Sequence, residues 1–210
     1  MFSMIRLLLI SSLFFSFISI SDGYTLVKDS SICSRKILEK STLTNTLSAN
    51  FSERKISSLY NTPKTAKGKL FFKKNDKIRW EHFDPNHQVI LINGKKIKYQ
   101  ENHKEIKNTT STMVVKKIQK LMLNLINGNF LAQKEFLINY YENNQNYKLI
   151  LKPLNKKIGR YLSEVDLIFD KNSLELKEME LCENETEKVE YTFSNIQINK
   201  SIDDSNFSNF

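Results

Sequence analysis

The chain has 210 residues, of which 40% are hydrophobic and 26% are charged, and this is enough apolar material for one sizeable core. The composition excludes a wholly disordered chain, a collagen and a coiled coil. The 32 Lys and Arg outnumber the 23 Asp and Glu, which gives a net charge of +9. The lysines are spread in short pairs and form no concentrated stripe, so we expect no nucleic-acid partner.

The N-terminal segment, residues 1–23, has the pattern of a cleaved signal peptide. Arg6 precedes the run Leu7 to Ile20, which is almost wholly apolar or Ser. A run of about 14 residues is short for a bilayer roughly 30 Å thick and fits a signal-peptide core instead. An uncleaved membrane anchor is the alternative. We expect cleavage after Ser21 or Gly23, export, and a single mature domain over residues 24–210.

The first predicted element of the mature chain is a helix capped by Asp29 or Ser30. Its apolar positions recur at three-to-four spacing and continue less regularly towards residue 47. These positions are Ile32, Cys33, Ile37, Leu43 and Leu47.

From Phe51 the apolar period changes from helical to alternating. The runs KGKLFFKK, KIRWEHF, QVILI and KIKYQ predict an antiparallel meander over residues 51–109. Asn75-Asp76 lies at one turn of this meander. Asn93-Gly94 lies between the last two runs and predicts a type I′ turn, which needs positive φ at both central residues.

A second, amphipathic helix is predicted to interrupt the strands, ending near Gly128. Its apolar face comprises Val114, Ile118, Leu121, Met122 and Leu125. Strands are then predicted at residues 136–143, 147–153, 164–170, 174–181 and 189–198. Residues 201–210 are polar, and we expect them to be loose apart from Phe207 and Phe210.

These elements predict an α+β fold, with one curved antiparallel sheet and two or three helices. Several strands are apolar on both faces, whereas a sheet with one wet face should alternate cleanly. Helices held against the sheet would cover the additional apolar face, and so would an apolar ligand.

No motif nominates an enzyme, a cofactor or a metal site. A polar group around one turn, formed by Glu81, His82, Asp84 and His87, admits a metal site, but polar residues at a strand edge are its ordinary explanation. Cys33 and Cys182 either form one disulfide or remain two separate small residues.

Residues 49–99 resemble the periplasmic lipoprotein carrier family LolA. The segment Ala49 to Glu53 resembles that family's A-x-F-x-Q opening, with Glu53 where Gln is usual. The segments Gly68 to Lys74, Ile78 to Glu81 and Pro85 to Tyr99 resemble its next strands and hairpin. The closing TFSNIQINKSIDDSNF is also similar to the end of the family pattern.

The resemblance implies a half-open, LolA/LolB-like β-barrel closed by helices, with an apolar cavity for acyl chains. It places Ile78 and Trp80 on the cavity face, and Leu91, Ile97 and Tyr99 are further candidates for lipid binding. Met122 and Leu125 would form the apolar face of a lid. Ordinary packing of the same residues into the core is the alternative.

The resemblance also implies a role for Lys74, which stands where carriers have an Arg that hydrogen-bonds the lid backbone. A lysine keeps the charge but lacks the planar fork of donors. Arg79 lies on the opposite strand face from Trp80, and we expect it outside.

The function implied is that of a monomeric periplasmic carrier that takes acylated lipoproteins from an inner-membrane ABC transporter and moves them to the outer membrane. An outer-membrane receptor is left open. The alternative is a periplasmic lipid-sensing regulatory module of the same fold. The basic surface is either simply solvated or attracted to anionic headgroups or an acidic partner.

Overall fold

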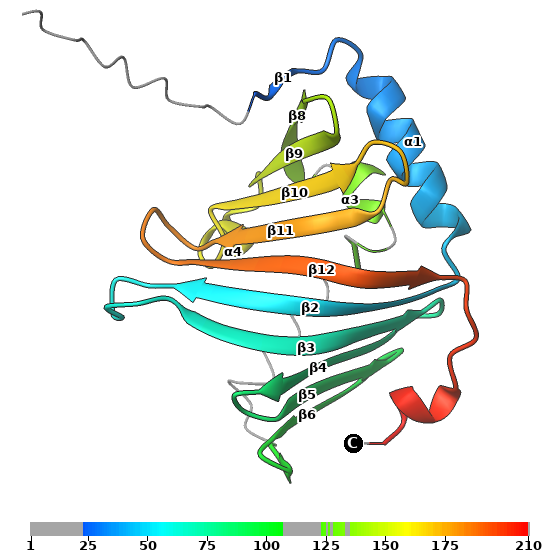
Figure 1. Ribbon diagram of the computed structural model, residues 1–210, viewed down its shortest axis with the longest axis vertical. Helices are drawn as coiled ribbons and strands as arrows, with labels where there is room; N and C mark the ends of the chain where they lie inside the picture. The colour runs from blue at the N-terminus through cyan, green and yellow to red at the C-terminus, as the bar shows by residue number, and fades with distance from the viewer. Residues whose placement is uncertain (1–22, 107–122, 125, 127, 133–134, 210) are drawn as a thin grey trace, which may run out of the picture.

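The computed structural model describes residues 23–106, 123–124, 126, 128–132 and 135–209, and it is mostly β. A single twelve-stranded antiparallel sheet runs in the order β1-β8-β9-β10-β11-β12-β2-β3-β4-β5-β6-β7 (Figure 1). One half comprises β2 (Thr46–Ile56), β3 (Lys64–Lys73), β4 (Lys77–Asp84), β5 (Gln88–Asn93), β6 (Lys96–Glu101) and β7 (Lys104–Glu105). The other comprises β1 (Thr25–Leu26), β8 (Phe136–Glu142), β9 (Asn146–Pro153), β10 (Glu164–Asp170), β11 (Leu176–Cys182) and β12 (Lys188–Ile198). The predicted curved antiparallel sheet is confirmed, and the described part of the chain is mostly β.

Among the described residues, the helices with assigned bounds are α1 (Ser30–Leu43), α3 (Asn129–Ala132), α4 (Lys156–Gly159) and a final 3₁₀ turn, η1 (Asp204–Phe207). Buried side chains of α1 and α3, such as Ile37 and Phe130, join the main hydrophobic cluster with strand residues from both halves of the sheet. We call the sheet face that carries this cluster the inner face. The opposite face is the outer face.

Helix α1 begins where the sequence predicts, because Asp29 Oδ1 accepts hydrogen bonds from the backbone N–H groups of Ser31 and Ile32. The predicted extension to Leu47 is wrong, since Leu47 lies in β2 opposite Phe72. The helix ends at Leu43, whose carbonyl accepts a hydrogen bond from Asn199 Nδ2 at 3.0 Å. The end of the helix is thus fixed by a residue at the far end of the chain.

The turn with two positive φ angles, predicted at Asn93-Gly94, is found instead at Asn75-Asp76. Asn75 and Asp76 both have positive φ, as a type I′ turn requires. Asn93 instead pairs with Lys96 as the last residue of β5, so the turn residues are Gly94 and Lys95. Positive φ occurs only at Gly94 of these two, which is the pattern of a type II′ turn, and the type I′ prediction for Asn93-Gly94 is wrong.

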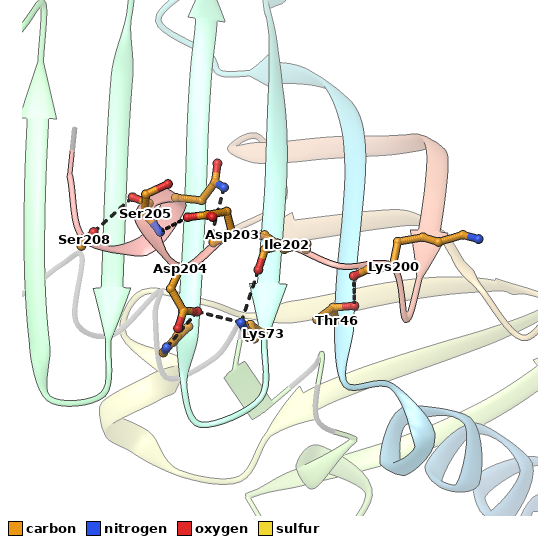
Figure 2. A network of polar contacts seen from close by, with 10 residues as sticks. Thr46, Lys73, Lys200, Ile202, Asp203, Asp204, Ser205 and Ser208 are labelled. Carbon is orange, nitrogen blue, oxygen red and sulfur yellow. Dashed lines mark hydrogen bonds and ion pairs between the residues drawn. The ribbon is translucent and has the colours of Figure 1, made fainter.

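The C-terminal residues 200–209, called here the C-terminal strap, are fastened to the outer face, and the expectation of a loose tail is wrong. Figure 2 shows Lys73 Nζ donating to the Ile202 carbonyl and to Asp204 Oδ1, at 3.3 and 2.7 Å. Lys77 Nζ lies 3.1 Å from the same carboxylate. The hydrogen bonds from Lys73 and Lys77 lower the pKa of Asp204. At pH values above the ordinary carboxyl range, these ion pairs therefore hold the strap on the sheet. They are lost as the pH falls through the lowered pKa of Asp204.

The strap also covers an apolar patch, because η1 lies against β4 and β5. Val89 and Leu91 of β5 are buried outside the main cluster, and so is Phe207 of the strap. Arg79 reaches the strap from β4 and donates to the carbonyls of Asn206 and Asn209 at 3.4 and 2.9 Å. Arg79 is on the outer face as expected, but it is covered.

Replacing Arg79 with alanine is expected to lower the free energy of unfolding by about 1–2 kcal/mol, because it removes both strap contacts and leaves Glu81 without its 2.7 Å partner. Urea unfolding measures the loss. Arg54→Ala is the control: Arg54 pairs with Glu190 at 2.7 Å, but its side chain is 53% exposed. We expect it to cost about 0.5 kcal/mol or less, and equal losses in the two variants would contradict the role given to Arg79.

Candidate functional site

The pairing of β4 with β5 and β6 decides which side chains share the inner face. Ile78 lies opposite Ile92, and Trp80 lies opposite Ile90. On β6, Ile97 and Tyr99 continue these two rows. The expectation that Ile78 and Trp80 share a face with Ile97 and Tyr99 therefore agrees with the register.

Leu91 is a correction to this set. It pairs with Arg79 on one side and with Lys98 on the other, so it belongs to the outer face. It is buried there, at 2% exposure, on the patch that the strap covers. Leu91 thus stabilises the attachment of the strap and does not line the same surface as Trp80.

A hollow of about 450 Å³ opens on the inner face of β2–β5 and β12. This volume is within the usual range for small-molecule pockets. Its apolar floor is formed by Ile78, Trp80, Ile90 and Ile92. Ile90 is only half-buried, whereas the other three floor residues are buried. A second hollow, between the end of α1 and β2, β3 and β10–β12, measures about 80 Å³ and is too small for a comparable ligand.

Aromatic rings on the inner face flank Trp80. The Trp80 ring lies 4.6 Å from the ring of Phe51 and 5.2 Å from that of Tyr191, measured between centroids. Phe51 can lie there because Gly68, directly opposite on β3, has no side chain. A Cβ at Gly68 would come within 2.2 Å of Phe51 Cζ and of the Glu81 carbonyl oxygen. Phe51 and Gly68 are therefore needed for the shape of the hollow.

Beside the apolar floor lies a polar layer that the sequence did not reveal. His82 Nε2 and Glu53 Oε2 are 2.8 Å apart, and both side chains are largely buried, at 15% and 17% exposure. Tyr191 donates its hydroxyl to the same carboxylate, and burial together with Glu53 raises the pKa of Tyr191 well above its usual value. Burial alone would raise the pKa of Glu53, but the hydrogen bonds from His82 and Tyr191 outweigh burial and hold it below its ordinary value.

Other predicted site residues stand apart from this hollow. Ile97 and Tyr99 are on the inner face, but they are not among the residues that line the hollow. Met122 and Leu125 lie outside the described residues. Leu123 and Ile126, from the same predicted helix, are helical and half-buried against the main cluster.

The polar group of Glu81, His82, Asp84 and His87 does not form one site. His82 faces Glu53 on the inner face, whereas His87 Nε2 lies 2.9 Å from Glu81 Oε1 on the outer face. Among the described residues, no group of three or more His, Cys, Asp or Glu is placed to hold a metal ion.

Of the two alternatives for the cysteines, the structure has separate thiols. Cys33 is buried on α1, and its burial raises the pKa of the thiol to about 11. Cys182, at the end of β11, donates to Glu180 Oε1 at 3.2 Å. Burial together with that carboxylate raises the pKa of Cys182 to about 12.

Lys74 reaches the last turn of α1, where its Nζ donates to the Thr42 carbonyl at 2.6 Å. The final carbonyls of a helix lack intrahelical partners and carry partial negative charge, so a cation is favourable there. The backbone N–H of Lys74 also donates to the Asn45 carbonyl at 2.8 Å. Lys74 thus ties the β3–β4 turn to the end of α1.

Replacing Lys74 with methionine is expected to lower the free energy of unfolding by about 0.5–1 kcal/mol, since the Thr42 carbonyl loses its charged donor. Thermal unfolding at low ionic strength measures the change. Lys74→Arg keeps the cation and should retain most of the stability. An arginine variant as unstable as the methionine variant would show that the contact with Thr42 does not depend on charge.

Comparison of the sequence with models of protein families identifies the family. Residues 42–209 match the model of the outer membrane lipoprotein carrier protein LolA. The chain belongs to the LolA family. Proteins of this family are periplasmic, non-enzymatic carriers, which agrees with the expectation that the chain is not an enzyme. A search of curated protein sequences found no match.

The solved structures that match this chain have low sequence identity to it. The LolA superfamily protein NE2245 from Nitrosomonas europaea is 12% identical, with a TM-score of 0.43, over 83% of this chain and 96% of its own. MucB is 8% identical, with a TM-score of 0.47, over 85% of this chain and 62% of its own. LprF from Mycobacterium bovis is 9% identical, with a TM-score of 0.41, over 82% of this chain and 95% of its own. In the part of the chain that the structure describes, no helix is long and apolar enough to cross a membrane.

Proposed function

We propose that the protein is a periplasmic carrier that binds the acyl chains of lipoproteins in the hollow over Trp80 and moves them from the inner to the outer membrane. The observation that carries this proposal is the apolar floor of Ile78, Trp80, Ile90 and Ile92 beneath a hollow of about 450 Å³. Membership of the LolA family supports the same role. Residues 1–23 would be the cleaved leader and residues 24–210 the carrier.

The physical requirement is that the hollow compensate for removing acyl chains from a membrane. Exposing an acyl chain to water costs about 0.8 kcal/mol per CH₂ group. A carrier must offer apolar surface of similar quality without closing into a tightly packed core. The floor suits this requirement, because Ile90 is only half-buried beside the buried Ile78, Trp80 and Ile92.

The partners in this proposal are acylated lipoproteins, a lipoprotein-releasing ABC transporter of the inner membrane and, at the end of the route, the outer membrane or a receptor within it. In this scheme the contact of Lys74 with the end of α1 is a latch that changes when cargo enters.

The experiment is a release assay. Inner-membrane vesicles containing a labelled lipoprotein and the transporter are incubated with ATP and the mature domain, residues 24–210. The proposal predicts a soluble complex of lipoprotein and carrier, and the same lipoprotein without its acyl chains should form none. Release that is independent of the added domain, or equal binding of the non-acylated protein, would contradict it.

A further inference from the structure

The lining of the hollow changes from apolar to polar and charged along its length. The floor is apolar at Ile78, Ile90 and Ile92. Continuing along β4, the next residue on the inner face after Trp80 is His82, and it lies against Glu53 of β2. Further along β2 the inner-face position is Lys55, opposite Lys64 of β3. An amphiphile with its chain on the floor would therefore place its head group at Glu53 and His82.

The head group would meet a carboxylate that keeps its negative charge. The hydrogen bonds from His82 and Tyr191 favour the ionised form of Glu53. Its side chain is 17% exposed, so water screens it less than it screens the exposed lysines at the rim. The Lys64 Nζ also lies over the ring of Tyr60, at 3.8 Å from the centroid.

We propose that Glu53 makes the hollow select acyl chains with an uncharged head group that donates a hydrogen bond, such as an amide, over free fatty acids. A fatty-acid carboxylate would face the Glu53 carboxylate at a partly desolvated position, where like charges repel strongly. An amide N–H can instead donate to Glu53. This inference rests on the proposed carrier function and adds a substrate class to it: the protein would reject the free fatty acids that a membrane also contains.

The rim charges oppose this selection only weakly. The rim is the end of the hollow beyond Glu53, where Lys55 and Lys64 lie. Both lysines are exposed, and the exposed Glu183 also lines the hollow. Their attraction for an anionic head group falls with salt, whereas the repulsion from the largely buried Glu53 persists. Selection should therefore survive at physiological ionic strength.

The test compares two probes with the same chain, octanoate, whose head group is a carboxylate, and octanamide, whose head group is an uncharged amide. Both are titrated calorimetrically into the mature domain below their micellar concentrations, at about pH 8, where carboxylates are ionised. We expect the amide to bind the native protein about tenfold more tightly or better. In Glu53→Gln the carboxylate probe should gain affinity, and the ratio should fall to about threefold or less.

Glu81→Gln is the matched control, because Glu81 also pairs with a histidine, His87 at 2.9 Å, but on the outer face. The tenfold ratio should remain in that variant. Equal binding of the two probes to the native protein, or a ratio unchanged in Glu53→Gln, would overturn the selection and leave the carrier function standing. Failure of the native protein to bind either probe would contradict both.

Discussion

Replacing Gly68 with alanine is expected to destabilise the protein by about 3 kcal/mol or more, among the largest effects of a single methyl group. The added Cβ would lie 2.2 Å from both Phe51 Cζ and the Glu81 carbonyl oxygen. The carbonyl belongs to the backbone of β4 and cannot swing away. The ring of Phe51 is 3% exposed and contacts Trp80, so its displacement would also deform the floor of the hollow.

Urea unfolding followed by circular dichroism measures this effect. Gly159→Ala is the control, because Gly159 has no positive φ and a Cβ there meets nothing within 4 Å. We expect that variant to be as stable as the native protein, within about 0.5 kcal/mol. A Gly68→Ala protein of native stability would mean that Phe51 and β4 do not pack as described.

Replacing Ile90 with aspartate is expected to weaken binding of an acylated ligand by about a hundredfold or more, since it places an unpaired carboxylate in the apolar floor. Ile90 suits this test because it is only half-buried, so the free protein can hydrate the new charge. The folded protein should survive, while the loaded state would have to desolvate a carboxylate against an acyl chain.

Calorimetric titration with a diacylated lipopeptide measures the loss. Leu26→Asp is the matched control: Leu26 is 70% exposed on the edge strand β1 and lies outside the hollow. The Leu26→Asp variant should bind the lipopeptide with the affinity of the native protein. If Ile90→Asp folds, as judged by circular dichroism, and still binds like the native protein, the ligand does not lie over this floor.

The parts of the fold that depend on neighbouring residues could be predicted from the sequence. The N-cap at Asp29 bonds to residues two and three positions away. Ile78 and Trp80 share a face because strand side chains alternate with a period of two. The type of turn at Gly94 was missed because one residue of register decides it, and register depends on the whole hairpin.

Features that depend on distant partners could not be predicted in this way. Leu91 sits in the continuous apolar run QVILI, where no alternation marks the faces, and the strap that buries its neighbourhood comes from the other end of the chain. The strap is polar in sequence, and its attachment through Arg79 and Lys73 becomes visible only when β3 and β4 are placed beneath it.

The polar layer of the hollow was missed for a similar reason. Glu53 and His82 are 29 residues apart, and Tyr191 is on the last strand. One signal was present, since Glu53 follows Ala49 and Phe51 at alternate positions of one strand and should share their buried face. A carboxylate at such a position needs partners, and a search for these could have nominated His82.

The most direct test of the acyl-binding hollow uses the single tryptophan of the chain, Trp80, which forms part of its floor. The mature domain is titrated with a diacylated lipopeptide brominated along its chains, because bromine quenches tryptophan emission only at close range. Binding over the floor predicts a saturable loss of most of the Trp80 emission, absent with the same peptide lacking acyl chains. Unchanged emission under conditions where calorimetry shows the lipopeptide bound would contradict the account, since the ligand would then lie elsewhere on the protein.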